Sequence, residues 1–432
     1  MNQTTRISRR GFLARAALVS TAPYIIPSSV LGENAPSNRI HVGILGAGGQ
    51  GRSLINYVYR HKDRARVIAV CDVNAENTAM AKSTVDHVNE AEDCAVYRDF
   101  REMLARDDLD AVVIATPDHW HALTSIAAAR AGKHIYGEKP VAYTVAEGRA
   151  MVEAVQRYGV IFQHGTQQRS QANFRHACAL VRNGRLGNIH TVRVGSPFGK
   201  RGGSIEAAPP PEGLDYEFWL GPAPYKPYTP GRCDGRSGEG WYHIRDYSGG
   251  WVTAWGSHDV DIAQWGMGAD HTSPIEYEGW GAFPTGGVYD TAWRWRVECR
   301  YADGVRMIYA SEDESPHGIR FEGDEGWLFV NRGVLEAEPV SLLAEKFSPD
   351  EEHLGDSTDH MGNFFDCIRT GATPASPIEA SHRSTSACHL CNVAMTLGRT
   401  VRWDPENERA VDDDEANRML ARAMRQPWHM LT

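Results

Sequence analysis

Short apolar runs alternate with segments of helical spacing through the first part of the chain, from residue 38 to residue 162. The clearest apolar runs, of the kind that strands buried on both faces show, lie at residues 40–45, 67–71, 111–115 and 134–136. Between them, Leu54, Ile55 and Val58 recur at the spacing of one helix face. The alternation predicts a parallel sheet with helices on both faces, whose strands end along one ligand-binding edge.

A different pattern begins at residue 163. A helical segment at residues 174–181 precedes a proline-rich stretch at 207–230, which we expect to form a long ordered loop. Closely spaced runs of period two, which predict a largely antiparallel sheet, lie at residues 293–298, 305–309, 319–321 and 327–330. Helical spacing returns at residues 360–368 and 379–397. Residues 163–432 are therefore predicted to form a second α/β domain, whose open sheet provides a substrate floor and the interface of a homo-oligomer.

Length, charge and cysteine content narrow the class of protein. With 432 residues the chain can bury two cores. Its formal net charge of −10 argues against a nucleic-acid partner and favours neutral or cationic small molecules. The eight cysteines are too sparse for a disulfide scaffold. Cys388 and Cys391 form a C-x-x-C without a second pair, so we interpret them as core residues on one helix face and predict no metal site.

The first 32 residues are predicted to be a targeting segment outside the fold. Arg9 and Arg10 precede a mainly small, apolar run at residues 12–30, and Ser8-Arg9-Arg10-Gly11-Phe12-Leu13 resembles the bacterial twin-arginine export signal. That pathway moves folded proteins, so we expect a periplasmic or otherwise exported protein with the twin-arginine machinery as a partner. A chance arginine pair on a disordered tail is the alternative. No other apolar stretch approaches the ~20 residues that span a bilayer.

A dinucleotide-binding fingerprint, Gly46-Ala47-Gly48-Gly49-Gln50-Gly51, follows the first strand and opens a helical segment. Gly46 permits a tight turn, Gly48 lets the backbone approach a pyrophosphate, and Gly51 lets the helix pack closely on its strand. The free amides of the helix N-terminus then face the phosphates, and Gln50 of the same loop is an expected cofactor contact. This context predicts a Rossmann domain at residues 38–162.

Asp72 closes the second predicted strand, about twenty residues after the fingerprint. A carboxylate at this place would accept hydrogen bonds from the adenosine ribose of the cofactor. The next residue, Val73, is not an arginine that could hold a 2′-phosphate. NAD is therefore the expected cofactor, and NADP is less favoured.

Two more strand ends should line the same crevice. Thr116-Pro117 follows the fourth strand, with His121 shortly after, and Glu138-Lys139-Pro140 follows the fifth. The Lys139-Pro140 bond is a candidate for a cis peptide, since X-Pro bonds adopt this form at little cost. The expected cofactor contacts from these two segments are Thr116, Pro117, His121, Glu138 and Lys139.

Together, the glycine loop, Thr116-Pro117 with His121, and Glu138-Lys139-Pro140 resemble the family of glucose-fructose oxidoreductase, inositol dehydrogenase and the rhizopine catabolism protein MocA. The likeness extends over nearly the whole chain that follows the targeting segment. It implies NAD-dependent oxidation of a CH-OH group. It also implies that Lys139 lies beside the nicotinamide and binds the hydroxyl that is oxidised.

The second motif of this family, D-x-G-x-H followed by an aspartate, corresponds to Ala254-Trp255-Gly256-Ser257-His258-Asp259-Val260-Asp261. The resemblance implies that His258 is the general base, because an imidazole titrates near neutrality and can accept the alcohol proton. A satisfied core histidine is the alternative. Ala254 replaces the first aspartate, so a partner of the substrate or imidazole is missing. On a helix Asp261 shares a face with His258, whereas Asp259 points roughly 100° away, which favours Asp261 as the substitute.

Aromatic residues surround this motif, among them Tyr242, Trp251 and Trp255. Their rings suit the apolar C-H faces of a sugar or cyclitol, although such clusters more often form cores. Gln168 and Arg169, just after the sixth strand, are candidates for contacts with hydroxyl groups. The expected substrate contacts are therefore Lys139, Arg169, Trp255, His258 and Asp261.

The main hypothesis is an exported NAD-dependent oxidoreductase that acts on a hydroxyl of a sugar, cyclitol or glycoside. Because free nicotinamide cofactor is a cytoplasmic metabolite, such an enzyme should carry its NAD tightly bound and regenerate it on a second substrate. A redox-neutral alternative returns the hydride after a transient ketone has eased cleavage of a glycoside. A non-catalytic sugar-binding protein that keeps the nucleotide as a structural element is the third hypothesis, which Ala254 encourages.

Overall fold

The structure is a computed structural model, and it describes residues 38–235, 238–355 and 357–430. The predicted targeting segment, residues 1–32, lies outside the described residues. The chain from Ile40 onward forms one unit with two large sheets. Within the described ranges, no helix combines the length and apolar character needed to cross a membrane.

The first sheet has six strands, all paired in parallel, in the order β3-β2-β1-β4-β5-β6. The strands are β1 (Ile40–Leu45), β2 (Ala65–Cys71), β3 (Ala95–Tyr97), β4 (Ala111–Ile114), β5 (His134–Gly137) and β6 (Phe162–His164). This is the strand order of a Rossmann domain, and the four predicted strands are β1, β2, β4 and β5. Their continuous apolar runs arise because side chains on both faces of these strands are buried.

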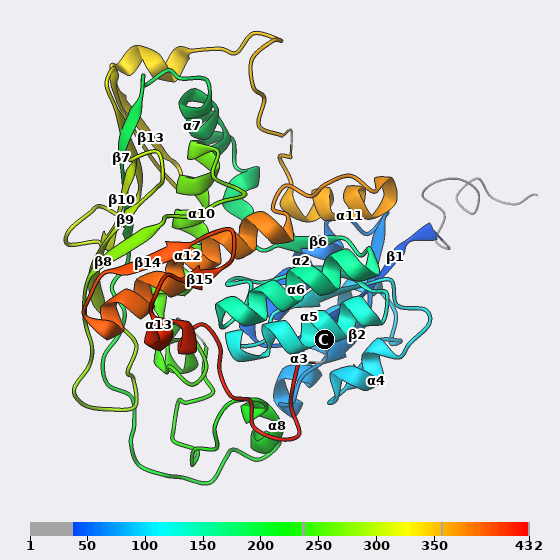
Figure 1. Cartoon of the computed structure of the whole chain (residues 1–432). Coiled ribbons are helices and arrows are strands. Elements are labelled where there is room, and N and C mark those ends of the chain that lie inside the picture. The colour runs from blue at the N-terminus through cyan, green and yellow to red at the C-terminus, as the bar shows by residue number, and fades with distance from the viewer. Residues whose placement is uncertain (1–37, 236–237, 356, 431–432) are drawn as a thin grey trace, which may run out of the picture. The chain divides into compact units, whose positions relative to one another are not determined.

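Helices cover both faces of this sheet (Figure 1). One face packs against α2 (Gly49–Tyr59), α3 (Ala75–Asn89) and α11 (His360–Thr370), and the other against α4 (Phe100–Leu104), α5 (His121–Arg130) and α6 (Val145–Tyr158). Although α11 belongs to the second half of the sequence, its Phe364 and Phe365 are fully buried in the core beside β1. The chain therefore returns to the Rossmann sheet after building the second one.

The second sheet has nine strands in the order β13-β12-β11-β7-β10-β9-β8-β14-β15. They are β7 (Ile189–Ser196), β8 (Glu276–Ala282), β9 (Arg294–Arg300), β10 (Arg306–Ser311), β11 (Gly318–Gly323), β12 (Gly326–Asn331), β13 (Val334–Glu338), β14 (Val401–Asp404) and β15 (Arg409–Ala410). Only the β7/β10 pair among these described strands is parallel. The prediction of a largely antiparallel sheet is confirmed, and its four period-two runs are β9 to β12.

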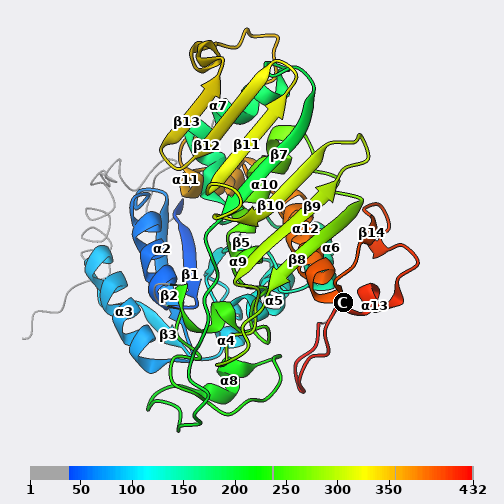
Figure 2. The same ribbon diagram turned by 90° about the vertical axis from the view of Figure 1, so that its left-hand side faces the viewer.

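Four helices lie on one face of this sheet, and Figure 2 looks onto the opposite face. They are α7 (Ala172–Arg182), α9 (Trp251–Ala254), α10 (Gly256–Met267) and α12 (Ile378–Leu397). The opposite face carries no helix of the described chain (Figure 2), and Trp280 of β8 is 42% exposed. The oligomer interface expected on this open face stays a prediction. Outside the two sheets, the proline-rich stretch forms a loop that contains the short helix α8 (Tyr216–Leu220), and α13 (Asp414–Arg418) lies near the end of the chain.

The C-x-x-C pair of α12 is part of the core under this sheet. Cys388 and Cys391 are fully buried, and all eight cysteines are free thiols. The thiol of Cys388 donates a hydrogen bond to the carbonyl oxygen of Ser384 at 3.3 Å, one helical turn earlier. The interpretation of these cysteines as core residues on one helix is confirmed.

A buried ion cluster ties the end of the Rossmann sheet to α10. Arg169, which follows β6, is 2% exposed and forms a bidentate pair with the fully buried carboxylate of Asp261, at 2.7 and 2.8 Å. The same guanidinium contacts Asp270 at 2.9 Å. Ser384 of α12 donates a further hydrogen bond to Asp261 at 3.0 Å. The cluster therefore sets the position of α10 against the first sheet.

Replacing Arg169 with Met should lower the free energy of unfolding by about 3–5 kcal/mol, because the substitution leaves Asp261 buried without its cation. Arg66→Met is the matched control. The Arg66–Asp93 pair, at 2.7 Å, is more exposed, and exposed pairs contribute only about 0–1 kcal/mol. Denaturant unfolding of the two variants measures the difference, and equal losses would contradict the role given to the buried cluster.

Candidate active site

The glycine loop joins β1 to α2, and the three glycines of its fingerprint, Gly46, Gly48 and Gly51, have different backbone surroundings. Gly46 has a φ of +88°, a left-handed conformation that glycine adopts at little cost. A Cβ on Gly51 would overlap with the carbonyl oxygen of Gly46, whereas a Cβ on Gly48 would meet no atom within 4 Å. Gly48 therefore leaves open space at the N-terminus of α2, where the phosphates of a dinucleotide would bind.

Asp72, directly after β2, holds this loop. Its carboxylate accepts hydrogen bonds from the backbone amides of Ala47 and Asn74, at 2.8 Å each, and from the side chain of Asn77 at 3.4 Å. Burial raises the pKa of Asp72, and these hydrogen bonds oppose the rise. The carboxylate thus lies at the glycine loop, as a ribose contact requires, and the preference for NAD over NADP stays a prediction.

Gln50 and Glu138 connect the glycine loop to the end of β5. The side-chain amide of Gln50 donates a hydrogen bond to Glu138 Oε1 at 2.9 Å. Since β4 and β5 are neighbours in parallel pairing, Thr116-Pro117 and Glu138-Lys139-Pro140 leave the sheet side by side. The Lys139-Pro140 peptide is cis, as the sequence allowed. The residues predicted to contact the cofactor are therefore gathered at one edge of the sheet.

His121 fastens the ends of β4 and β5 to each other. Its Nδ1 lies 2.6 Å from the carbonyl oxygen of Pro140, and its Nε2 lies 2.9 Å from that of Thr116. Burial lowers the pKa of His121. Because both ring nitrogens face backbone carbonyls, His121 supports the two strand ends, and its contact with the cofactor stays a prediction.

Lys139 lies among aromatic and acidic side chains. Its Nζ is 5.4 Å from the centroid of the Tyr242 ring. The nearby carboxyl of Asp118 is fully buried. Burial raises the pKa of Asp118 to about 7, while the Ser248 hydroxyl and the Lys139 ammonium oppose the rise. Asp118, to which the sequence analysis assigned no role, can therefore gain or lose a proton near neutrality beside the lysine.

His258 of α10 belongs to the same group of residues. It is 5% exposed, and its Nδ1 has no hydrogen-bond partner among the described residues. Burial lowers the pKa of His258 well below its usual value, and the positive charges of Lys139 and Arg332 lower it further. His258 is therefore a neutral imidazole near neutral pH, which is the form that accepts a proton. Ring contacts from Tyr242 through Trp251 to Trp255 connect the surroundings of Lys139 to those of His258.

Trp255, between α9 and α10, is surrounded by cationic and titratable side chains. Its ring centroid lies 5.9 Å from that of His258 and 4.8 Å from that of His317, which packs edge-on. The guanidinium of Arg332 lies 5.2 Å from the same centroid. Trp255 is partly exposed and thus offers an aromatic surface beside His258. Its contact with a substrate stays a prediction.

His164, at the end of β6, is a member of this group that the sequence analysis missed. It is fully buried, and neither ring nitrogen has a hydrogen-bond partner among the described residues. Burial lowers its pKa, and the nearby charge of Lys139 contributes to the shift. Gln168 is 1% exposed and likewise has no described partner for its side-chain amide. Buried polar atoms without partners are rare, so both side chains are candidates for ligand contacts. The one sequence signal for His164 was its place at a strand end.

Arg169 and Asp261 differ from their predicted roles. Both were expected to contact substrate, and Asp261 was expected to replace the carboxylate missing at Ala254. The structure instead pairs them with each other in the buried cluster, where Asp270 and Ser384 take up the remaining hydrogen bonds. Spacing on the helix placed Asp261 correctly relative to His258, but the partner of its carboxylate comes from another part of the chain.

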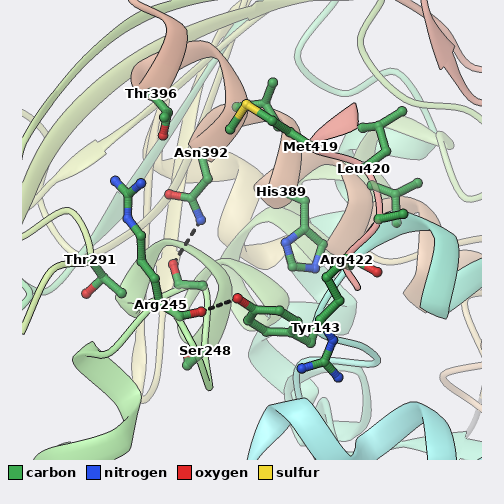
Figure 3. Close-up of a pocket in the computed structure, with 15 residues that line it drawn as sticks. Tyr143, Arg245, Ser248, Thr291, His389, Asn392, Thr396, Met419, Leu420 and Arg422 are labelled. Atoms are coloured by element: carbon green, nitrogen blue, oxygen red, sulfur yellow. Dashed lines mark hydrogen bonds between the residues drawn. The ribbon is translucent and has the colours of Figure 1, made fainter. Parts of the chain in front are cut away.

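A separate pocket lies beside Tyr143, just after the Glu138-Lys139-Pro140 segment (Figure 3). The hydroxyl of Tyr143 donates a hydrogen bond to the carbonyl oxygen of Arg245, and the amide of Asn392 donates to that of Gly249 at 2.9 Å. None of the predicted catalytic, cofactor or substrate residues lines this pocket. The candidate site is therefore the sheet edge around Lys139.

The described residues fit a dinucleotide better than a metal. Across residues 38–235, 238–355 and 357–430, no three His, Cys, Asp or Glu side chains are grouped to hold a metal ion. By contrast, the open space at Gly48 suits a pyrophosphate, and Asp72 lies where a ribose would bind. The nicotinamide end would then lie toward Lys139, at the ends of β4 and β5.

Two family models match most of the chain. One, described as an oxidoreductase family with an NAD-binding Rossmann fold, matches residues 40–166. The other, the C-terminal alpha/beta domain of the same oxidoreductase family, matches residues 196–430. The fold is similar to that of the WlbA dehydrogenase from Bordetella pertussis, solved with NADH and UDP-GlcNAcA. The TM-score is 0.62 at 20% identity, over 85% of this chain and 99% of that one, which is a likeness of fold.

Curated relatives match over a shorter range. The chain is 31% identical over 155 residues to the 2,7-anhydro-N-acetylneuraminate hydratase of Mediterraneibacter gnavus, covering 35% of this chain and 39% of the relative. It is 33% identical over 156 residues to a glycosyl hydrolase family 109 protein of Shewanella baltica, covering 33% of each chain. These matches span less than half of the relatives' own length.

Two glycine variants separate the structural and cofactor-binding roles of the loop. Gly51→Ala should destabilise the protein by about 1–3 kcal/mol, because its Cβ overlaps with the Gly46 carbonyl oxygen. Gly48→Ala should change stability by less than about 1 kcal/mol. It should nevertheless weaken NAD binding by about tenfold or more, equivalent to ~1.4 kcal/mol.

Thermal unfolding and a titration of cofactor-free protein with NAD measure the two effects. A Gly48→Ala protein that is stable and binds NAD as tightly as the parent would contradict the placement of the pyrophosphate.

Proposed function

Because this chain belongs to the Gfo/Idh/MocA oxidoreductase family, we propose that it is an NAD-dependent enzyme acting on a hydroxyl group of a sugar, cyclitol or glycoside. The observation that supports this proposal is that the charge of Lys139 acts on the buried imidazole of His258, while Glu138, the neighbour of Lys139, accepts a hydrogen bond from Gln50 of the glycine loop. An ammonium and a neutral imidazole beside a hydride acceptor are the groups that oxidation of an alcohol requires.

Each side chain has a separate role in the oxidation of the substrate hydroxyl. Bound NAD would supply the hydride acceptor. The ammonium of Lys139 donates a hydrogen bond to the substrate hydroxyl and so orients its C-H bond toward the cofactor. His258 accepts the hydroxyl proton, and because Nδ1 is fully buried, Nε2 is the nitrogen that receives it. The titrating carboxyl of Asp118 adjusts the charge next to Lys139 when that proton moves.

A carbohydrate substrate is supported by the surroundings of His258 and by the relatives. Trp255 and Tyr242 present aromatic rings next to His258 and Lys139, and aromatic rings pack well on the C-H faces of sugars. The WlbA dehydrogenase was solved with a nucleotide sugar. The hydratase and family 109 relatives support the redox-neutral alternative, for which bound NAD would supply both the uptake and the return of the hydride.

Export through the twin-arginine pathway is part of the same proposal. It is supported by Ser8-Arg9-Arg10 and by the eight free cysteines, which suit a chain that folds in a reducing compartment before transport. An exported enzyme has no soluble pool of nicotinamide cofactor. The NAD is therefore expected to travel tightly bound and to be recycled in place.

The purified protein should carry nicotinamide cofactor through gel filtration without added NAD, and should exchange hydride between that cofactor and at least one deuterated sugar. His258→Asn should slow this exchange by about 10²–10⁴-fold, because the proton acceptor is lost, while cofactor content is unchanged. His353→Asn, at an exposed position, is the control. Full exchange in His258→Asn would exclude His258 as the base.

Export depends on the arginine pair in this proposal. The double variant Arg9→Lys/Arg10→Lys should accumulate in the cytoplasm of a bacterial host with an active twin-arginine pathway, while the parent chain reaches the periplasm. Arg6→Lys, three residues earlier, should be exported like the parent. Fractionation and immunoblotting measure the distribution, and periplasmic protein in the double variant would refute the assignment.

A further inference from the structure

The carboxylate of Asp259, next to His258 on α10, is fully buried and is not part of the ion cluster around Arg169. The hydroxyl of Ser196 donates a hydrogen bond to Asp259 Oδ2 at 2.8 Å. His317 Nε2 lies 3.4 Å from the same oxygen. Oδ1 has no hydrogen-bond partner among the described residues. Asp259 is therefore a buried carboxylate with an imidazole at ion-pair distance.

His317, immediately before β11, lies beside this carboxylate. Its Nε2 is buried and has no hydrogen-bond partner among the described residues, and the 3.4 Å contact with Asp259 Oδ2 is an ion-pair contact. The side chain as a whole is 23% exposed, which leaves Nδ1 as the accessible ring nitrogen. The side-chain amide of Asn331 donates a hydrogen bond to the backbone carbonyl oxygen of His317 at 2.7 Å. The ring packs edge-on against Trp255, which also adjoins His258.

The first aspartate of the family motif is replaced by Ala254, so another residue must provide a carboxylate near the histidines. Ala254 carries none, and Asp261 is taken up by Arg169. Asp259 is the other acidic residue of α10, and it points away from His258 toward His317. Two imidazoles therefore pack against Trp255. Among the described residues, His317 lies beside a carboxylate and His258 does not. A single proton acceptor is enough for hydride transfer, so the second imidazole points to another proton-transfer step.

We propose that His317, oriented by Asp259, is the general acid that protonates the departing oxygen of a glycoside. This inference rests on the proposed function in its redox-neutral form. The carbon next to the transient ketone loses its proton to water, and the C-H electron pair forms a C=C bond. The C-O bond breaks toward oxygen, which receives the proton of His317 Nδ1. Water then adds across the double bond: its hydroxyl binds the carbon, its proton restores His317, and solvent reprotonates the neighbouring carbon.

Leaving-group dependence tests this role. A methyl glycoside needs an acid because methoxide leaves poorly, whereas 4-nitrophenolate leaves without protonation. His317→Gln should lower kcat/KM for the methyl glycoside by about 10²–10⁴-fold and that for the 4-nitrophenyl glycoside of the same sugar by less than about threefold. Asp259→Asn, a change in the positioning residue, should show the same selective loss. His190→Gln, at an exposed site on β7, should affect neither substrate.

Equal losses of His317→Gln on both glycosides would overturn the proposal. Exchange of solvent deuterium into the sugar carbon next to the oxidised one reports the ketone step separately, and it should persist in His317→Gln. A parent enzyme that exchanges hydride with sugars but cleaves neither glycoside would overturn the role of His317 and leave the oxidoreductase function standing. A parent enzyme without any hydride exchange would overturn both. If His317→Gln does not fold, the selective loss in Asp259→Asn decides the question.

Discussion

Parallel pairing of β1, β4 and β5 is the constraint on which the rest of the site depends. Parallel strands end at the same edge, so segments far apart in sequence meet there. The hydrogen bond between Gln50 and Glu138 and the contacts of the His121 ring with two backbone carbonyl oxygens then hold the loops together. Lys139 emerges from this network, and its position relative to the glycine loop is fixed by backbone pairing.

Helix α10 supplies the site residues that do not come from the Rossmann sheet, among them His258. Successive residues on a helix point about 100° apart, so His258 and Asp259 meet different neighbours. The ion pair of Asp261 with Arg169 ties the helix to the end of β6. Because Asp261 lies one turn after His258 on the same face, that anchor also sets the direction in which His258 points.

The charged and neutral side chains of the site differ in how deeply they are buried. Arg169 and Asp261 neutralise each other in the interior, where a lone charge would be strongly destabilising. In the part of the chain that the structure describes, no carboxylate pairs with His258, and burial together with the charges of Lys139 and Arg332 lowers its pKa. His317 faces a carboxylate and is more exposed. Two histidines that pack against one tryptophan thus have different surroundings, since only His317 lies at ion-pair distance from a carboxylate.

The sequence by itself determined the two sheets, the glycine loop and the strand ends that carry Lys139. These features are encoded in local periodicity and spacing, which depend on neighbours a few residues away. Only the tertiary structure decided which polar side chains pair with each other and which remain available to contact a ligand. Arg169 and Asp261 are 92 residues apart in the chain, and Asp259 and His317 also come from separate segments. Hydrogen bonds and ion pairs between distant segments leave no periodic signal, so the buried cluster, His164 and His317 emerged only from the fold.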